Sequence, residues 1–405
     1  MKAHHLTARL WLAAALLSVF LPPDLRLGRW LPLHLALLGT ASQLIAGGQI
    51  MFSGALSMAP PVRRRHIAGS LVFLNLGAAA IAVGRISGAL PMVGLGATAF
   101  LAGAVWSGLV ADSRWRRGLG TRFRITRIYY ALAGASIVIG GTAGAILAFG
   151  LLPGGQIHNS HRLMHMAFNL FGWAGMTIVG TAVTLLPAIL RTRAVELRSL
   201  AWAPWTMFAG LVLMAGGVSV GSEWPAAAGG AVLLAGLVPF ARLAARVATS
   251  PRRFPVPVAA WHLMAAIWWL GMVSVAQIWL LAAGDWAALS DLWLVGLAGG
   301  TVLQAILGAW SFLLPMEQRV GGELRRLHLV AFELGSRLQI GAYNLGLVLL
   351  FVSLRAAGPA GTRQFALSLI WAATAWALFK SFSFLLLARL PRVARRSKDW
   401  WKPER

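Results

Sequence analysis

Cysteine is absent from this 405-residue chain. Its absence excludes disulfide bonds, covalently attached c-type haem, thiolate-ligated copper and iron–sulfur clusters held by cysteine. A metal ion bound by the chain must therefore be ligated by histidine, carboxylate, methionine or amide groups.

Charged residues are also scarce. They make up 12% of the chain, whereas hydrophobic residues make up 58%, which is too apolar for a soluble protein of this length. Apolar runs of about 18 or more residues recur from one end to the other, and each is long enough to cross about 30 Å of hydrocarbon as a helix. Lipid offers no partners for exposed backbone groups, and the runs do not alternate as membrane strands do. The sequence therefore predicts an all-α polytopic membrane protein.

We predict about twelve transmembrane helices in one integral membrane domain that covers residues 1–405. The connections between them leave no room for a soluble domain. The first apolar run lacks a persuasive signal-peptide cleavage site, so we expect it to remain as a helix, with His4 and His5 in a short tail before it. The predicted spans are 8–22, 31–56, 66–86, 89–111, 127–150, 159–190, 201–221, 224–242, 257–283, 289–316, 328–354 and 363–388.

Lysine and arginine are distributed unevenly between the two ends of these helices. The segments that follow the even-numbered helices carry 26 of the 36 basic residues, and those that follow the odd-numbered helices carry six. This is the positive-inside pattern, and it places both termini in the cytoplasm. The net charge of +25 then reflects orientation, so we expect the lipid bilayer as a partner and no nucleic acid.

An internal repeat of about one third of the chain is visible in the motifs. Gly180 and Leu185-Leu186-Pro187 recur as Gly308 and Leu313-Leu314-Pro315, 128 residues later. The histidines His34 and His165, early in helices 2 and 6, are 131 residues apart. We therefore expect three four-helix arcs, with pseudo-repeats at roughly 1–126, 127–256 and 257–405.

A column of polar residues opens helix 6. His158, His161, His165 and Asn169 follow at steps of three and four, which return to nearly the same helix face. Imidazole is a common metal ligand and the usual axial ligand of b-type haem. The topology places His34 at the same outer side of the bilayer as this column.

The candidate cofactor ligands are His34, His161 and His165, and the candidate metal ligands are His158, His161 and His165. A histidine at a helix end also suits the lipid headgroup region, and for His158 we favour that role. His161 fits either role. No catalytic residue is assigned.

Helix 6 also carries a recognisable motif. The segment His165-Met-Ala-Phe-Asn169-Leu-Phe-Gly172-Trp173-Ala-Gly175 continues through Gly180-Thr181 to Pro187. It resembles a helix of bacterial membrane proteins related to subunit I of haem–copper oxidases and nitric oxide reductases, including NnrS-type proteins. The segment from Gly308 to Pro315 is similar to the matching helix of that group. The resemblance implies three four-helix arcs, a haem b ligand at His34 and metal ligands among the histidines of helix 6.

The chain departs from that family at two helices. Helix 7 (201–221) has no histidine, so the usual copper-binding pair is missing, and helix 10 (289–316) lacks both haem ligands expected there. The resemblance therefore implies a degenerate member, in which one haem b or copper ion is held by His34 with His161 or His165, or no cofactor is held. Whether such a protein is an enzyme stays open. The implied roles are electron transfer, nitrogen-oxide handling or metal homeostasis, with a redox subunit or copper protein as partner.

Two other interpretations stay open. A secondary transporter also suits twelve helices with both ends inside, although transporters are usually built from two equal repeats. A cofactor-free accessory or assembly subunit would use the polar column of helix 6 only for helix–helix contacts.

Overall fold

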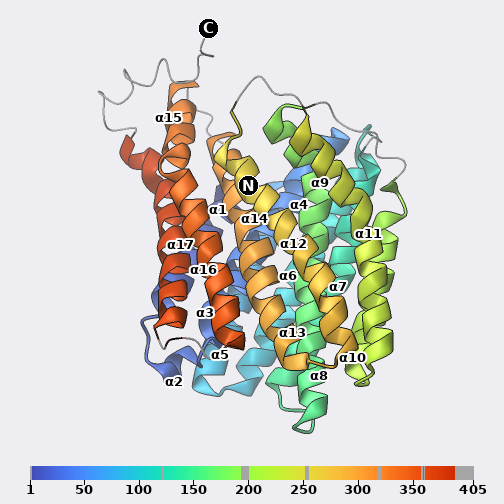
Figure 1. Cartoon of the computed structure of the whole chain (residues 1–405). Coiled ribbons are helices and arrows are strands. Elements are labelled where there is room, and N and C mark those ends of the chain that lie inside the picture. The colour runs from blue at the N-terminus through green and yellow to red at the C-terminus, as the bar shows by residue number, and fades with distance from the viewer. Residues whose placement is uncertain are drawn as a thin grey trace.

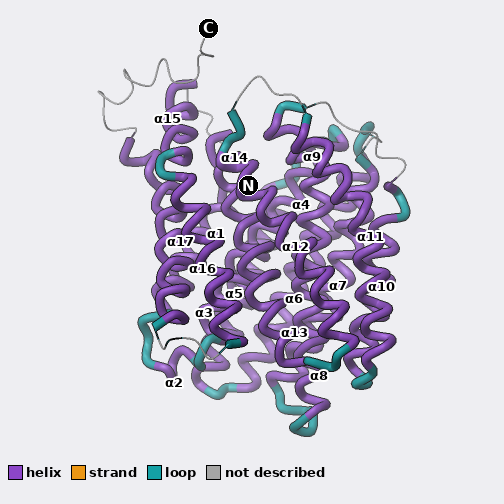
Figure 2. Tube along the Cα trace, in the orientation of Figure 1, coloured by secondary structure: helices purple, strands orange, loops and turns teal. Residues whose placement is uncertain are grey.

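The computed structural model describes residues 2–120, 123–192, 200–250, 255–316, 322–356, 359 and 361–387. Every regular element in these ranges is helical, and the helices form one bundle of roughly parallel and antiparallel rods (Figure 1, Figure 2). The predicted all-α class is confirmed.

Ten helical runs of the described residues are long and apolar enough to cross a membrane, which confirms a multi-pass membrane protein. Two further helices of 17 residues, α1 (Lys2–Ser18) and α10 (Ala203–Ser219), are shorter than these. The ten runs are Pro23–Ser57 (α2, α3, η1 and α4), Arg64–Ser87 (α5), Leu90–Arg117 (α6), Arg124–Ala148 (α7), Gln156–Leu190 (α8, η2 and α9), Glu223–Thr249 (α11), Val258–Ala282 (α12), Trp286–Met316 (α13, η4 and α14), Ser336–Arg355 (α16) and the apolar part of Thr362–Leu387 (α17).

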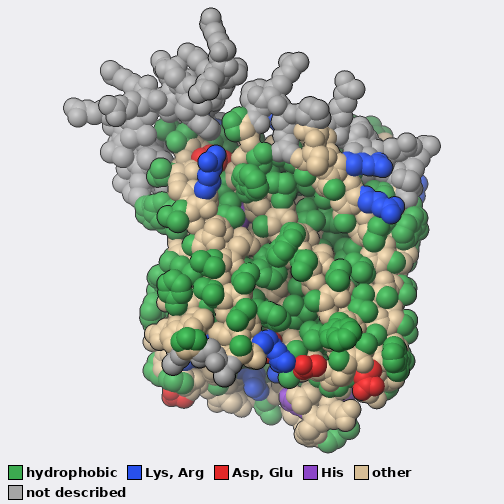
Figure 3. Space-filling model, viewed as in Figure 1, with side chains coloured by type: hydrophobic (Ala, Val, Ile, Leu, Met, Phe, Trp, Pro, Cys, Tyr) green, Lys and Arg blue, Asp and Glu red, His purple; other side chains and the backbone are tan. Residues whose placement is uncertain are grey.

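The surface agrees with this assignment. Hydrophobic side chains cover the middle of the face shown in Figure 3, while basic and acidic side chains lie toward its two ends. Such a belt is what a hydrocarbon layer requires of the side chains that face it.

Two predicted boundaries are wrong. Helix α1 begins at Lys2, so His4 and His5 lie inside a helix, 1% and 2% exposed, and not in a tail. The predicted span 328–354 is broken at Gly335, which adopts a left-handed conformation with φ of 63°. Glycine pays no Cβ penalty there, so α15 (Gly322–Glu333) ends and α16 begins as a separate helix.

The break at Gly335 gives Glu333 a role that its sequence position does not reveal. Its Oε1 accepts a hydrogen bond of 2.9 Å from the backbone N–H of Val258, in the first turn of α12. The first N–H groups of a helix lack partners within it, so this carboxylate caps α12 from another helix. Burial raises the pKa of Glu333, against the opposing effects of the Val258 N–H and the nearby Lys380.

Three of the spans form the centre of the bundle. Their apolar windows are 67%, 78% and 78% buried, against 22% to 39% for the other seven. Each contains a π-helical segment, in which backbone hydrogen bonds join residues five positions apart instead of the four of an α-helix. The segments are η1 (Leu35–Ala41), η2 (Phe168–Met176) and η4 (Trp293–Leu303).

The same packing accompanies each central span. In each central span, two glycines that are eight residues apart pack against the preceding helix. Their contact partners on that helix are seven residues apart. A Cβ added to any of these glycines would lie only 2.4 to 3.1 Å from its partner. The contact pairs are Gly39–Trp11 and Gly47–His4, Gly172–Ser136 and Gly180–Tyr129, and Gly300–Trp269 and Gly308–His262. Each central span is also followed by two helices packed along one another: α5 with α6, α10 with α11, and α16 with α17.

Candidate functional site

His34 lies at the last position of α3 (Trp30–His34), directly before η1. Its Nδ1 donates a hydrogen bond of 2.8 Å to the carbonyl oxygen of Trp30, one turn earlier. The Trp30 ring stacks on the imidazole, with centroids 4.0 Å apart and planes 20° apart, and the Arg85 guanidinium lies over Trp30. These contacts fix the orientation of the half-buried His34 ring.

His165 lies near the end of α8 (Gln156–Ala167), three residues before η2. Its Nδ1 donates a hydrogen bond of 2.8 Å to the carbonyl oxygen of Gly140 on α7, and Asn169 donates one of 2.7 Å to the His165 carbonyl. Glycines of α7 provide the space: a Cβ at Gly144 would lie 2.6 Å from the imidazole, and one at Gly140 would lie 2.6 Å from the Asn169 amide.

The structure brings His34 and His165 together. Their ring centroids are 6.4 Å apart and their planes differ by 12°. Because a carbonyl can only accept a hydrogen bond, each Nδ1 carries the proton, and in the neutral imidazole the Nε2 lone pair is available. Two imidazoles that share one metal ion through nitrogen, at about 2 Å each, have centroids roughly 6 Å apart.

The other two histidines of the predicted column lie elsewhere. His158 is exposed near the start of α8, and the Nδ1 of His161 donates to the carbonyl of Ile157 on its own helix. Among the residues that the structure describes, no group of three or more His, Asp or Glu side chains gathers at a site that could hold a metal ion. The arrangement therefore offers a pair of ligands.

A second buried polar group lies apart from the predicted ligands. Lys380 on α17 is 2% exposed, and its Nζ donates to the Phe332 carbonyl at 2.9 Å and to Gln339 Oε1 at 2.7 Å. Arg9 on α1 is 8% exposed and donates to the Ser381 carbonyl at 2.8 Å. The expectation that His4 and His5 lie in a tail conceals that α1 carries buried polar residues. The matching spacing of His4 to Trp11 and His262 to Trp269, seven residues each, is a signal that could have revealed it.

No protein-family model matches this chain, and no curated protein sequence matches it.

Proposed function

We propose that this chain is a degenerate haem–copper-oxidase-like membrane protein in which His34 and His165 hold one haem b or copper ion. The observation that carries the proposal is the pair of parallel imidazoles 6.4 Å apart, each fixed by a backbone carbonyl. An imidazole that ligates a metal through one nitrogen usually donates a hydrogen bond from its other nitrogen to a carbonyl or carboxylate oxygen.

A pair of ligands suits these two groups in particular. Haem iron takes four nitrogens from its porphyrin, so His34 and His165 would supply the two ligands that it needs from the protein. Copper(I) is soft and accepts few ligands, whereas a structural zinc ion is almost always four-coordinate. The described residues supply no third histidine or carboxylate at the pair, which disfavours zinc.

The chain's own residues would then set the properties of the bound metal. The metal would supply one-electron chemistry, while the carbonyls of Trp30 and Gly140 hold the imidazoles in the ligating tautomer. Trp30 covers the His34 ring, which limits the access of water to it. This arrangement favours electron transfer, nitrogen-oxide handling or metal homeostasis, with a redox subunit or copper protein as partner at the outer face.

The proposal includes a finer architecture of twelve crossings in three four-helix arcs. In this architecture, α1 and α10 would add two crossings to the ten longer spans. The recurring glycine contacts and the three π segments favour three repeats, whereas a secondary transporter is usually built from two. The positive-inside pattern favours both termini in the cytoplasm, and the resemblance to bacterial membrane proteins favours a bacterial cytoplasmic (inner) membrane.

An absorption spectrum of the detergent-purified protein, oxidised and reduced, with metal analysis of the same sample, tests the ligand pair. We expect stoichiometric b-type haem or copper in the wild type, and its loss in His34→Ala and in His165→Ala. His158→Ala is the matched control, because this exposed histidine lies on the same helix as His165 and should leave the metal content unchanged. Full retention of the metal in both ligand variants contradicts the assignment, and so does a wild type without metal after expression with ample haem and copper.

A further inference from the structure

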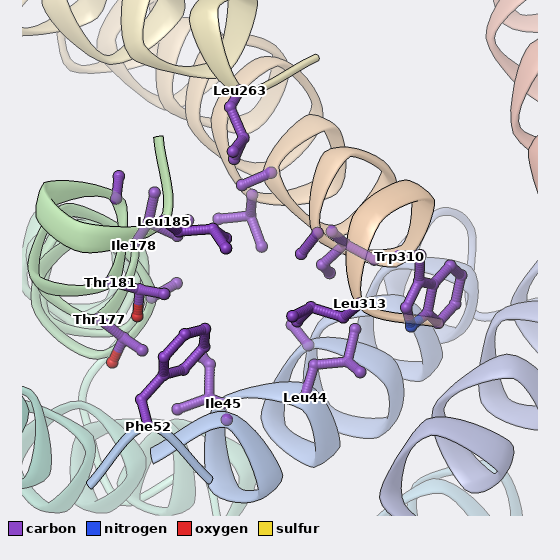
Figure 4. Close-up of a pocket in the computed structure, with 18 of the residues that line it drawn as sticks. Leu44, Ile45, Phe52, Thr177, Ile178, Thr181, Leu185, Leu263, Trp310 and Leu313 are labelled. Carbon is purple, nitrogen blue, oxygen red and sulfur yellow. The ribbon is translucent and has the colours of Figure 1, made fainter. Parts of the chain in front are cut away.

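A cavity of about 90 Å³ lies between the three central spans (Figure 4). Its walls are α4 (Ser42–Ser57), α9 (Thr177–Leu190) and α14 (Gln304–Met316), together with the last residues of the π segments that precede them. One helix from each of the three central spans contributes a wall. The residues Leu44, Thr177 and Leu313 in Figure 4 show this three-sided arrangement.

The lining residues of the three walls are in register. At one end of the cavity lie Ala41, Ala174 and Val302, and at the other lie Phe52, Leu185 and Leu313. In each set, successive residues are 133 and 128 positions apart. The same steps relate Gly39, Gly172 and Gly300, which pack the π segments against their neighbours. The three walls therefore contribute equivalent positions of the three proposed repeats, and we call this space the axial cavity.

The walls of this axial cavity are almost wholly apolar. Among its lining side chains, the Thr177 hydroxyl donates to the Trp173 carbonyl at 2.7 Å, and Thr181 bonds the Tyr130 hydroxyl at 2.9 Å. His5 is the one ionisable side chain in the lining. An apolar cavity holds water poorly, since water needs two to four polar partners.

The cavity extends along the helix axes of its walls. Ala41 and Phe52 are eleven residues apart on a helix, a rise of about 16 Å. Small side chains create the space, and a Cβ at Gly48 would meet nothing within 4 Å. A larger side chain at Gly48 could therefore occupy part of the cavity without a shift of the backbone.

We propose that the axial cavity holds one acyl chain of a membrane lipid. An acyl chain matches the length, the apolar walls and the location inside membrane-spanning helices. A quinone ring carries two carbonyl oxygens that need donors, whereas the lining is mainly aliphatic, and the hydroxyls of Thr177 and Thr181 are already bonded within the protein. His5 and Trp310 are the nitrogen-bearing side chains among the described residues that line it. The proposal is independent of the metal site, because neither His34 nor His165 lines the cavity.

Lipid extraction and mass spectrometry of the extensively washed protein test the proposal, with thermal unfolding as the check of folding. We expect about one acyl lipid per chain in the wild type and a decrease of roughly tenfold or more in Gly48→Leu, because the new side chain occupies the cavity. Gly216→Leu is the matched control: Gly216 is an exposed helical glycine, also with nothing within 4 Å of its Cβ position, and its lipid content should remain.

Ala174→Leu and Ala309→Leu fill the same space from the other two walls and serve if Gly48→Leu does not fold. A wild type without stoichiometric lipid overturns the proposal, and so does a quinone as the retained molecule. Equal lipid in Gly48→Leu and Gly216→Leu also overturns it. The metal content should be unchanged in these variants, so that failure of the lipid site and failure of the metal site are distinguishable.

Discussion

At the scale of single residues, the candidate metal site depends on glycines as much as on histidines. His165 and Asn169 project into space left by Gly140 and Gly144 on α7. The sequence alone revealed the histidines, because intramembrane polar residues are few and stand out. It could not select His165 over His161, because that choice depends on which helix lies opposite and where that helix lacks side chains.

The first prediction concerns this space. We expect Gly144→Ala to reduce metal affinity roughly tenfold or more, because its Cβ would lie 2.6 Å from the His165 ring and displace it. Gly134→Ala is the control on the same helix, since its Cβ position meets nothing within 4 Å. The metal content of both purified variants is measured by titration and spectroscopy. Equal affinity in the two would show that the His165 position does not matter to binding.

At the scale of elements, hydropathy located most of the helices but not their interruptions. The predicted span 159–190 agrees closely with Gln156–Leu190, since a long apolar run with charged flanks leaves little choice. The break at Gly335 and the π segments were not foreseen. Both are settled by packing against neighbouring helices, which a single sequence does not contain.

The Gly335 break leads to a second prediction. Gly335→Ala should destabilise the protein by about 1–2 kcal/mol, because alanine must adopt the left-handed conformation there. Gly341→Ala, inside α16 with open space at its Cβ, should be neutral or should stabilise by up to about 1 kcal/mol. Thermal unfolding in detergent compares the two. A Gly335→Ala variant as stable as Gly341→Ala would contradict the left-handed turn.

At the scale of the whole molecule, the number of crossings determines which face each connection occupies. The apolar runs of the sequence predict twelve, while the structure contains ten long spans in its described part and two shorter helices. Length cannot decide whether a 17-residue helix crosses, because local bilayer thickness and helix tilt vary.

The missing cysteines make a topology test direct. Single cysteines at Ser87 and Thr249, both exposed at helix ends, can be labelled in intact cells with a membrane-impermeant thiol reagent. If α10 crosses, five crossings separate the two sites, so Ser87→Cys should react from outside and Thr249→Cys only after lysis. Reaction of both from the same side would show that α10 does not cross.

The π segments also set the rotational phase between the two ends of each central span. In an α-helix each residue rotates the chain by about 100° around the helix axis. A π segment contains one extra residue that does not add this rotation. η1 lies between His34 and Ser42, where the α-helix that lines the cavity begins. Straightening η1 into an α-helix would therefore turn His34 by about 100° relative to the cavity wall, away from His165. A rotation of this kind would separate the two imidazoles while the helix itself stayed in place.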